Sequence, residues 1–231
     1  MSYVISPESR PALPVNGSSQ TFPVRRIHCV GRNYADHVRE MGNDERDPPF
    51  FFSKPADAIL LEGSDFPYPP LSEDVQHEIE LVVAIGTAGR SIAKEDALNH
   101  VYGYGVGIDM TRRDLQAKAK EMRRPWDGGK AFDHAAPCSA ITPARDIGHP
   151  DKGRIWLSVN DEIRQDGDLD QQIWGVAESI WCLSQSVALE PGDLIMTGTP
   201  AGVGPVKPGD TMTGGIEGLG ELRIQVVDGL F

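Results

Sequence analysis

The sequence of 231 residues lacks the long apolar runs and targeting signals that mark membrane and secreted proteins. No hydrophobic stretch approaches the ~20 residues that cross a bilayer, and no charged start is followed by an apolar core. We therefore expect a cytoplasmic protein without a membrane partner. Cysteine is scarce, since only Cys29, Cys138 and Cys182 occur and none has a paired spacing. This usage favours a reducing compartment and small buried side chains over disulfides or a zinc site.

Basic residues are few relative to acidic ones. Lys and Arg number 22 against 34 Asp and Glu, which gives a formal net charge of -12. Such a charge disfavours nucleic acid and anionic membranes as partners. A small anionic ligand would then need local cations or a metal ion.

Hydrophobic residues, glycine and proline are plentiful, at 39% of the chain, 25 residues and 18 residues respectively. A chain of this length and hydrophobic content buries a sizeable core. The glycines and prolines predict bent, strongly twisted sheets with a few peripheral helices, an α+β fold that is mainly β. We expect an N-terminal arm over residues 1–24 and one domain over residues 25–231.

Local patterns predict several elements of that domain. Strands are expected at "RRIHCVG" and "ELRIQVV", and a hairpin at "RIWLSVNDEIRQDG" with its turn at Asn160 and Asp161. Helices are expected over residues 33–42 and 173–187. A further helix follows Thr111, which is predicted to cap it, with Asp114 completing a capping box.

The first candidate for chemistry is the acidic pair in "DVQHEIELVVAIG". Side chains alternate along a strand, so Glu78 and Glu80 point to one face. Two adjacent carboxylates either stay solvated, share a proton or neutralise themselves on a cation. Asp109, at the end of the glycine-laced strand "GYGVGID", could supply a third oxygen ligand for Mg²⁺ or Mn²⁺. It could equally be a turn residue that caps the following helix.

Three other segments carry candidate groups. His37 and Glu40 fall three residues apart on the predicted helix, which suits a general base held by a carboxylate but also an ordinary surface pair. Lys130 follows two glycines in "WDGGKAFD", where it could offset carboxylate or enolate charge or remain a solvated loop lysine. In "MTGTPAGVGPV", the Thr199 hydroxyl and free backbone amides could bind an anion.

Taken together, the segments of the chain resemble the fumarylacetoacetate hydrolase family over residues 25 to 227. The resemblance rests on "CVGRNYADHVREMG", "FFFSKPADAI", "HEIELVVAIG", "GYGVGIDMTRRDLQ", "GGKAFD", "VNDEIRQDG" and "GDLIMTGTPAGVG". It implies a mixed β-sandwich roll, a homodimer and a catalytic domain over residues 25–231. It also implies a divalent cation at Glu78, Glu80 and Asp109.

The same resemblance implies roles for the remaining candidates. His37 and Glu40 would activate water from a lid, and Lys130 would act as an electrophilic lysine. The residues expected to contact the oxo-acid end of a substrate are Arg113, Gln116 and Thr199.

The expected activity is metal-dependent cleavage of the carbon–carbon bond in a 1,3-diketo acid, with fumarylpyruvate ahead of other acylpyruvates. The basic residues expected near the pocket are Arg32, Lys54, Arg113, Arg123 and Arg124. The metal and Arg113 would satisfy the pyruvyl carboxylate, which leaves another of these cations to pair with a second carboxylate at the far end. One alternative is decarboxylation of oxaloacetate, or isomerisation or decarboxylation of a hydroxymuconate. The other is a catalytically idle metal-binding interaction protein with the same fold.

Overall fold

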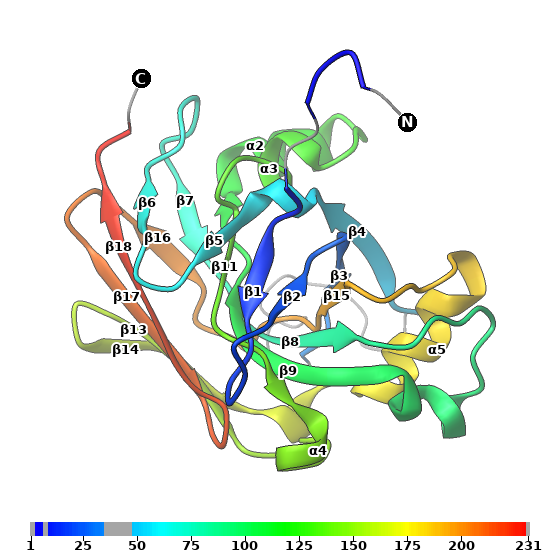
Figure 1. Ribbon diagram of the computed structural model, residues 1–231. Coiled ribbons are helices and arrows are strands. Elements are labelled where there is room, and N and C mark those ends of the chain that lie inside the picture. The colour runs from blue at the N-terminus through cyan, green and yellow to red at the C-terminus, as the bar shows by residue number, and fades with distance from the viewer. Residues whose placement is uncertain (1–2, 7–8, 35–47, 230–231) are drawn as a thin grey trace.

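The computed structural model describes residues 3–6, 9–34 and 48–229 of the chain (Figure 1). It is mainly β, with a curled, mixed sheet system and a few peripheral helices, which confirms the fold class expected from the sequence. Most of the helix predicted over residues 33–42 lies outside the described residues, as do His37 and Glu40. Among the described residues, the helices are all too short or too polar to span a bilayer.

The largest sheet holds eight strands in the order β4-β3-β15-β8-β9-β11-β5, with β12 paired to β9. Strands β3 and β15 run parallel, as do β11 and β5, while β8 is antiparallel to both of its neighbours. All seven residues of β8 are buried, as expected for an apolar run covered on both faces. The bounds are β3 Arg26–Gly31, β4 Phe50–Lys54, β5 Ile59–Leu61, β8 Ile79–Ile85, β9 Val101–Ile108, β11 Ala136–Cys138, β12 Thr142–Pro143 and β15 Asp193–Met196.

A five-stranded sheet in the order β14-β13-β17-β18-β6 packs against the first. The predicted hairpin is present, and both Asn160 (φ 53°) and Asp161 (φ 66°) adopt the left-handed conformation that a two-residue turn between twisted strands requires. The closing strand was also predicted correctly. The bounds are β6 Asp65–Pro67, β13 Arg154–Val159, β14 Glu162–Asp168, β17 Thr211–Ile216 and β18 Gly220–Val227.

Two small sheets complete the β structure. One has the order β10-β7-β16, and the other pairs β1 with β2. Leu13 of β1 and Phe22 of β2 are buried in the hydrophobic core. The boundary of the arm at residue 24 remains a prediction. The bounds are β1 Ala12–Pro14, β2 Thr21–Pro23, β7 Val75–His77, β10 Thr111–Arg112 and β16 Gly204–Val206.

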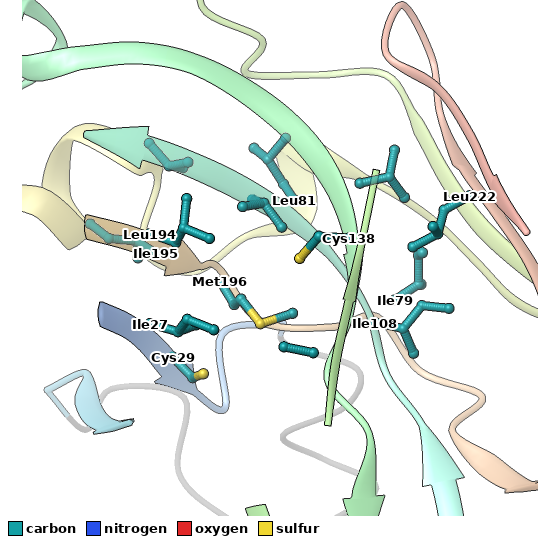
Figure 2. Close-up of a cluster of buried hydrophobic side chains, with 14 of the residues drawn as sticks. Ile27, Cys29, Ile79, Leu81, Ile108, Cys138, Leu194, Ile195, Met196 and Leu222 are labelled. Atoms are coloured by element: carbon teal, nitrogen blue, oxygen red, sulfur yellow. The ribbon is translucent and has the colours of Figure 1, made fainter. Parts of the chain in front are cut away.

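The core lies between the two larger sheets and continues beneath the parallel strands. Figure 2 shows Ile79 and Ile108 of the large sheet beside Leu222 of β18. The sheets approach closely because β17 carries a glycine there: a Cβ on Gly214 would lie 2.5 Å from Cδ1 of Ile79. Cys29 and Cys138 are free thiols buried in this core, as the cysteine pattern predicted.

The helices lie around the sheets. Within the described ranges, four are α-helices and three are 3-10 turns. The α-helices are α2 Arg113–Glu121, α3 Asp127–Lys130, α4 Ala144–Ile147 and α5 Val176–Ser186, and the 3-10 turns are Ala56–Ala58, Lys94–His100 and Leu169–Gln171. Helix α5 begins three residues later than predicted, after Gly175, whose N–H donates to Glu178 (3.1 Å).

The predicted capping of α2 is wrong. The helix begins at Arg113 without a side-chain cap, and Thr111 lies in strand β10. The Thr111 hydroxyl donates to the backbone oxygen of Asp109 (3.1 Å), while Asp114 accepts hydrogen bonds from Ser72 Oγ (2.7 Å) and from the N–H of Glu73 (3.0 Å). Tertiary partners therefore replace the local capping box.

Candidate active site

Three carboxylates meet at one end of the paired strands β8 and β9. Glu80 lies in β8 opposite Gly107 of β9, Glu78 lies in the gap between β7 and β8, and Asp109 directly follows β9. The N–H of Asp109 donates to the backbone oxygen of Glu78 (2.8 Å), which fixes the two residues across from each other. One oxygen from each carboxylate lies within 4.8 Å of the others, and all three side chains are buried. The structure thus brings together the three residues that strand alternation and the glycine-laced strand had suggested.

Lys130 contacts two of these three carboxylates. It ends the short helix α3, and its buried ammonium group donates to Glu78 Oε2 (2.7 Å), Asp109 Oδ2 (2.7 Å) and Thr111 Oγ1 (2.6 Å). Burial acts to lower the pKa of Lys130, but the charges of Asp109 and Glu78 outweigh it and raise that pKa. Lys130 is therefore a protonated cation, and the hypothesis of a solvated loop lysine is wrong.

Lys54 also points into the cluster, in a role that sequence reasoning missed. Its fully buried ammonium group, at the end of β4, lies 2.8 Å from Asp109 Oδ1 and donates to the Met110 backbone oxygen (3.1 Å). The only sequence signal for this position is alternation, because Phe50, Phe52 and Lys54 share one face of the strand.

Glu80 differs from its two neighbours in having no cationic partner among the described residues. Its one hydrogen bond is from the N–H of Gly198 (2.7 Å). Burial raises the pKa of Glu80 well above its usual value, and the nearby charges of Asp109 and Glu78 raise it further. A buried carboxylate that forms no ion pair within the described residues, beside two more carboxylates, is a hard-oxygen donor set suited to Mg²⁺ or Mn²⁺. The residues present therefore fit a divalent cation.

Arg113 and Gln116 project from the first turn of α2 toward the cluster. The guanidinium of Arg113 forms an ion pair with Glu78 and donates to Gln76 Oε1 (2.8 Å) and Gln116 Oε1 (2.9 Å). Gln116 lies under Gly129, where a Cβ would come within 2.9 Å of the Gln116 backbone nitrogen. The glycines before Lys130 thus allow α3 to pack directly on α2.

Thr199 follows β15 and is held from behind by a residue of the second sheet. Gln165 of β14 is fully buried and donates to Thr199 Oγ1 (2.8 Å) and to the Pro200 backbone oxygen (2.8 Å). Its amide oxygen accepts from the N–H of Ile79 (3.1 Å) and lies 2.9 Å from His77 Nδ1. Sequence reasoning missed Gln165, because nothing in "DEIRQDG" distinguishes it from a solvent-facing strand residue.

Most of these groups line one cavity. It is lined by Val30, Gly31, Arg32, Phe50, Phe52, Glu78, Glu80, Asp109, Arg113, Gln116, Lys120, Trp126, Lys130, Gly198 and Thr199. We call the buried residues Glu78, Glu80, Asp109 and Lys130 the floor of the cavity. We call the half-buried residues Arg32, Phe50, Lys120 and Trp126 its rim.

The five basic residues predicted near the pocket lie in different surroundings. Lys54 and Arg113 are already paired with Asp109 and Glu78, and Arg123 and Arg124 are exposed beyond the end of α2. Arg32 remains, at the rim. Lys120, which sequence reasoning did not consider, joins it there.

The fold and this cavity define a class of protein. Residues 26–227 match the fumarylacetoacetate hydrolase C-terminal family, so the chain belongs to that family of enzymes and the resemblance seen in the sequence is confirmed.

Three individual proteins are similar to this chain over most of its length. The crystal structure of fumarylpyruvate hydrolase from Pseudomonas aeruginosa, in complex with Mn²⁺ and pyruvate, is 53% identical and superposes with a TM-score of 0.95, covering 98% of this chain and 100% of that one. The mitochondrial oxaloacetate tautomerase of Homo sapiens is 42% identical and covers 87% of this chain and 91% of its own length. The mitochondrial oxaloacetate decarboxylase of Dictyostelium discoideum is 44% identical, with 84% and 90% covered.

Proposed function

We propose that this enzyme is a metal-dependent hydrolase that cleaves the carbon–carbon bond of a 1,3-diketo acid, with fumarylpyruvate as its substrate and pyruvate and fumarate as products. The observation that carries the proposal is the buried Glu80, which has no cationic partner within the described part of the chain and lies beside Glu78 and Asp109, in a cavity that also presents Lys130 and Arg113. The likeness to a fumarylpyruvate hydrolase that binds Mn²⁺ and pyruvate supports it.

Glu78, Glu80 and Asp109 would hold the divalent cation. When bound, the cation supplies Lewis-acid polarisation of the oxygen atoms of a 2-oxo acid. Arg113, Gln116 and Thr199 line the same cavity and offer a guanidinium, an amide and a hydroxyl to the oxo-acid end of the substrate. Gln165 keeps the Thr199 hydroxyl in place, and Gln76 and Glu78 do the same for the Arg113 guanidinium.

Different residues of the chain are proposed to carry out the separate steps of the reaction. His37, oriented by Glu40, is proposed to remove a proton from water as the water attacks the C4 carbonyl of fumarylpyruvate. The C3–C4 bond then breaks, the C4 side leaves as fumarate, and the electron pair passes to the pyruvyl side as an enolate. The Lys130 ammonium offsets this developing charge, and protonation of C3 gives pyruvate.

A second candidate is enolate chemistry on oxaloacetate without added water. The 42% identity to an oxaloacetate tautomerase and the 44% identity to an oxaloacetate decarboxylase favour it, because both reactions proceed through an enol of a 2-oxo acid. Those reactions do not need a water-activating His37, which separates them from hydrolysis.

The test is a panel of fumarylpyruvate, acetylpyruvate and oxaloacetate assayed with Mg²⁺ or Mn²⁺, before and after chelation. We expect pyruvate release from fumarylpyruvate that chelation abolishes. We also expect His37→Ala to lower hydrolysis by ~100- to 10,000-fold while metal binding is kept. Turnover of oxaloacetate alone would favour the second candidate, and no metal-dependent turnover of any member would favour a catalytically idle metal-binding protein.

We further propose that the enzyme is a cytoplasmic homodimer that uses Mg²⁺ in the cell. Light scattering of the purified protein tests the oligomeric state. Competition between Mg²⁺ and Mn²⁺ at cellular concentrations tests the choice of metal.

A further inference from the structure

The rim of the cavity holds two cations that no carboxylate of the described residues neutralises. The guanidinium of Arg32 lies 5.5 Å from the ring centroid of Phe50, and its Nε is buried without a hydrogen-bond partner within the described part of the chain. The ammonium of Lys120 lies 5.0 Å from the ring centroid of Trp126. By contrast, Lys54, Arg113 and Lys130 are each paired with a carboxylate of the floor.

The rim is a packed structure and not a pair of loose surface side chains. The rings of Phe50 and Trp126 contact each other edge to face, with centroids 5.4 Å apart, so the two cations rest on one aromatic unit. Gly31 makes room for it, because a Cβ there would lie 2.2 Å from Cζ of Phe50. Arg32 itself has a φ of 59°, a left-handed conformation that is unfavourable for an arginine and that the surrounding packing must hold in place.

Strand β4 connects the rim to the floor. Lys54 reaches Asp109, Phe52 lies against Lys130 with its ring centroid 5.1 Å from the ammonium nitrogen, and Phe50 supports Arg32. These three residues share one face of the strand, so an apolar wall runs from the oxygen-rich floor to the cationic rim. A ligand bound at the floor by an oxo-acid group and extended along this wall would end between Arg32 and Lys120.

The positive charge at the rim would be stabilised by a bound anion. The pKa of Lys120 falls to about 8, because burial disfavours its charged form and because Arg113 and Arg32 repel it. A carboxylate placed at the rim would counter both effects. Lys118, on the same helix, is exposed and outside the cavity, so it supplies a matched control.

We propose that Arg32 and Lys120 form a second carboxylate-binding subsite that selects diketo acids carrying a distal carboxylate over acylpyruvates with a neutral tail. This inference rests on the proposed function, since it assigns the far end of the same substrate. It makes Lys120 and Arg32 specificity-determining residues.

Steady-state kinetics on fumarylpyruvate and acetylpyruvate test the subsite. A charge-assisted hydrogen bond predicts that Lys120→Met lowers kcat/KM for fumarylpyruvate by roughly 10- to 100-fold, while kcat/KM for acetylpyruvate changes less than about threefold. Lys120→Arg should restore most of the selectivity, and Lys118→Met should leave both substrates unaffected. Equal losses on both substrates, or no loss on either, would overturn the proposal.

A binding experiment separates failure of the subsite from failure of the proposed function. The probes are 2-oxoheptanedioate and 2-oxoheptanoate, which match fumarylpyruvate in chain length, lack the 4-oxo group that hydrolysis requires, and differ only in the distal carboxylate. Calorimetry in Mg²⁺ buffer should give the diacid at least tenfold tighter binding, and Lys120→Met or Arg32→Met should remove that preference. If the diacid preference is present but fumarylpyruvate is not cleaved, the reaction is wrong and the subsite stands. If wild type binds the two acids equally, the subsite is wrong whatever the enzyme cleaves.

Discussion

The large sheet buries one carboxylate at each end of its central strands. The two carboxylates differ in how many hydrogen-bonding and cationic partners they have. Asp193, at the start of β15, receives hydrogen bonds from Arg25 (3.0 Å), Arg26 (2.8 Å) and the N–H of Glu190 (2.9 Å). Glu80, near the other end, receives one from the described part of the chain, donated by the N–H of Gly198. Both side chains are almost completely buried.

The difference in partners sets the charge of each group. Burial acts to raise the pKa of Asp193, but the hydrogen bonds from Arg26, Glu190 and Arg25 outweigh it and hold that pKa below its usual value. At Glu80 burial acts in the same direction, neighbouring carboxylates add to it, and the pKa rises. Two carboxylates with almost no solvent exposure thus differ in their partners: Asp193 forms a structural ion pair, whereas Glu80 has no cationic partner among the described residues and is available to a bound cation.

The largest expected effect comes from Glu80→Gln. The substitution removes one of three anionic oxygens, so it should weaken binding of Mg²⁺ and Mn²⁺ by more than the ~10- to 100-fold that loss of an outer-shell partner costs. Activity should fall to background. The metal-free variant should be as stable as wild type or more so, because the substitution removes a buried carboxyl group whose charged form is disfavoured and has no cationic partner among the residues that the structure describes. Calorimetric metal titration and urea unfolding in chelator measure the two effects.

Glu78→Gln serves as the matched variant. Glu78 is paired with Arg113 and Lys130, so its neutralisation should weaken metal binding and also lower the free energy of unfolding in chelator. Unchanged metal binding by both variants would contradict the assignment of the metal site. A stability loss for Glu80→Gln as large as that for Glu78→Gln would contradict the contrast between paired and unpaired carboxylates.

At the other end of the sheet, Asp193→Asn should affect stability and leave the chemistry alone. It removes the charge shared by Arg25 and Arg26, and breaking a buried ion pair costs about 3 to 5 kcal/mol when no rehydration is possible. The two arginine side chains are about one-third exposed, at 34% and 35%, and can rehydrate in part. We therefore expect a loss of about 3 kcal/mol in urea unfolding. A kcat/KM lowered more than about threefold at 25 °C would show that the two ends of the sheet are coupled.

The sequence is sufficient to predict elements whose signal is local. The alternation of Glu78 and Glu80, the end of a strand at Asp109 and the turn at Asn160 and Asp161 follow from periodicity and turn chemistry over a few residues. The same reasoning gave helix α5, with its start misplaced by three residues.

Residues whose role depends on a distant partner could not be predicted in this way. Lys54 is separated from Asp109 by 55 positions, and Gln165 reaches Thr199 from the other sheet. Thr111 has the local pattern of a helix cap, yet its hydroxyl is used by Lys130 and by the Asp109 backbone. In each case a tertiary hydrogen bond in a buried setting outweighs the local preference.

The pH dependence of stability gives a third way to test the two ends of the sheet. His28 lies on β3 beside β15, and burial, with repulsion from Arg26, lowers its pKa from 6.5 to about 4. The unfolded chain therefore takes up a proton before the folded one does. The stabilising contribution is fully present above pH 6.5 and is lost as the pH falls toward 4, by at most about 3 kcal/mol.

Asp193 affects the free energy of unfolding at lower pH than His28 does. Its folded-state pKa lies below the ordinary 3.8, so its contribution is present above that pH and is lost as the pH falls through the folded-state value. Urea unfolding at steps from pH 8 to pH 3 should show the free energy of unfolding falling twice, first in the range of His28 and then in that of Asp193. His28→Leu should flatten the upper loss and leave the lower one in place. Asp193→Asn should reduce the lower loss and slightly enlarge the upper one, because the charge of Asp193 raises the pKa of His28. A single loss that neither variant changes would assign the acid sensitivity to other groups.

The smallest expected effect on the free energy of unfolding concerns Glu178, a carboxylate near the surface that can be compared with the buried Asp193. Glu178, at the start of α5, pairs with Lys94 at 2.6 Å, but the two side chains are 30% and 56% exposed. Exposed pairs of this kind contribute little, because water and salt compensate for their loss, so Lys94→Met should lower the free energy of unfolding by less than about 1 kcal/mol. Added salt should reduce even this effect in wild type, whereas the loss caused by Asp193→Asn should persist, since a buried pair is poorly screened. Urea unfolding of both variants at low and high ionic strength makes the comparison. If Lys94→Met costs as much as Asp193→Asn, burial is not what sets the energetic value of a carboxylate in this fold, and the contrast between Asp193 and Glu80 would need another explanation.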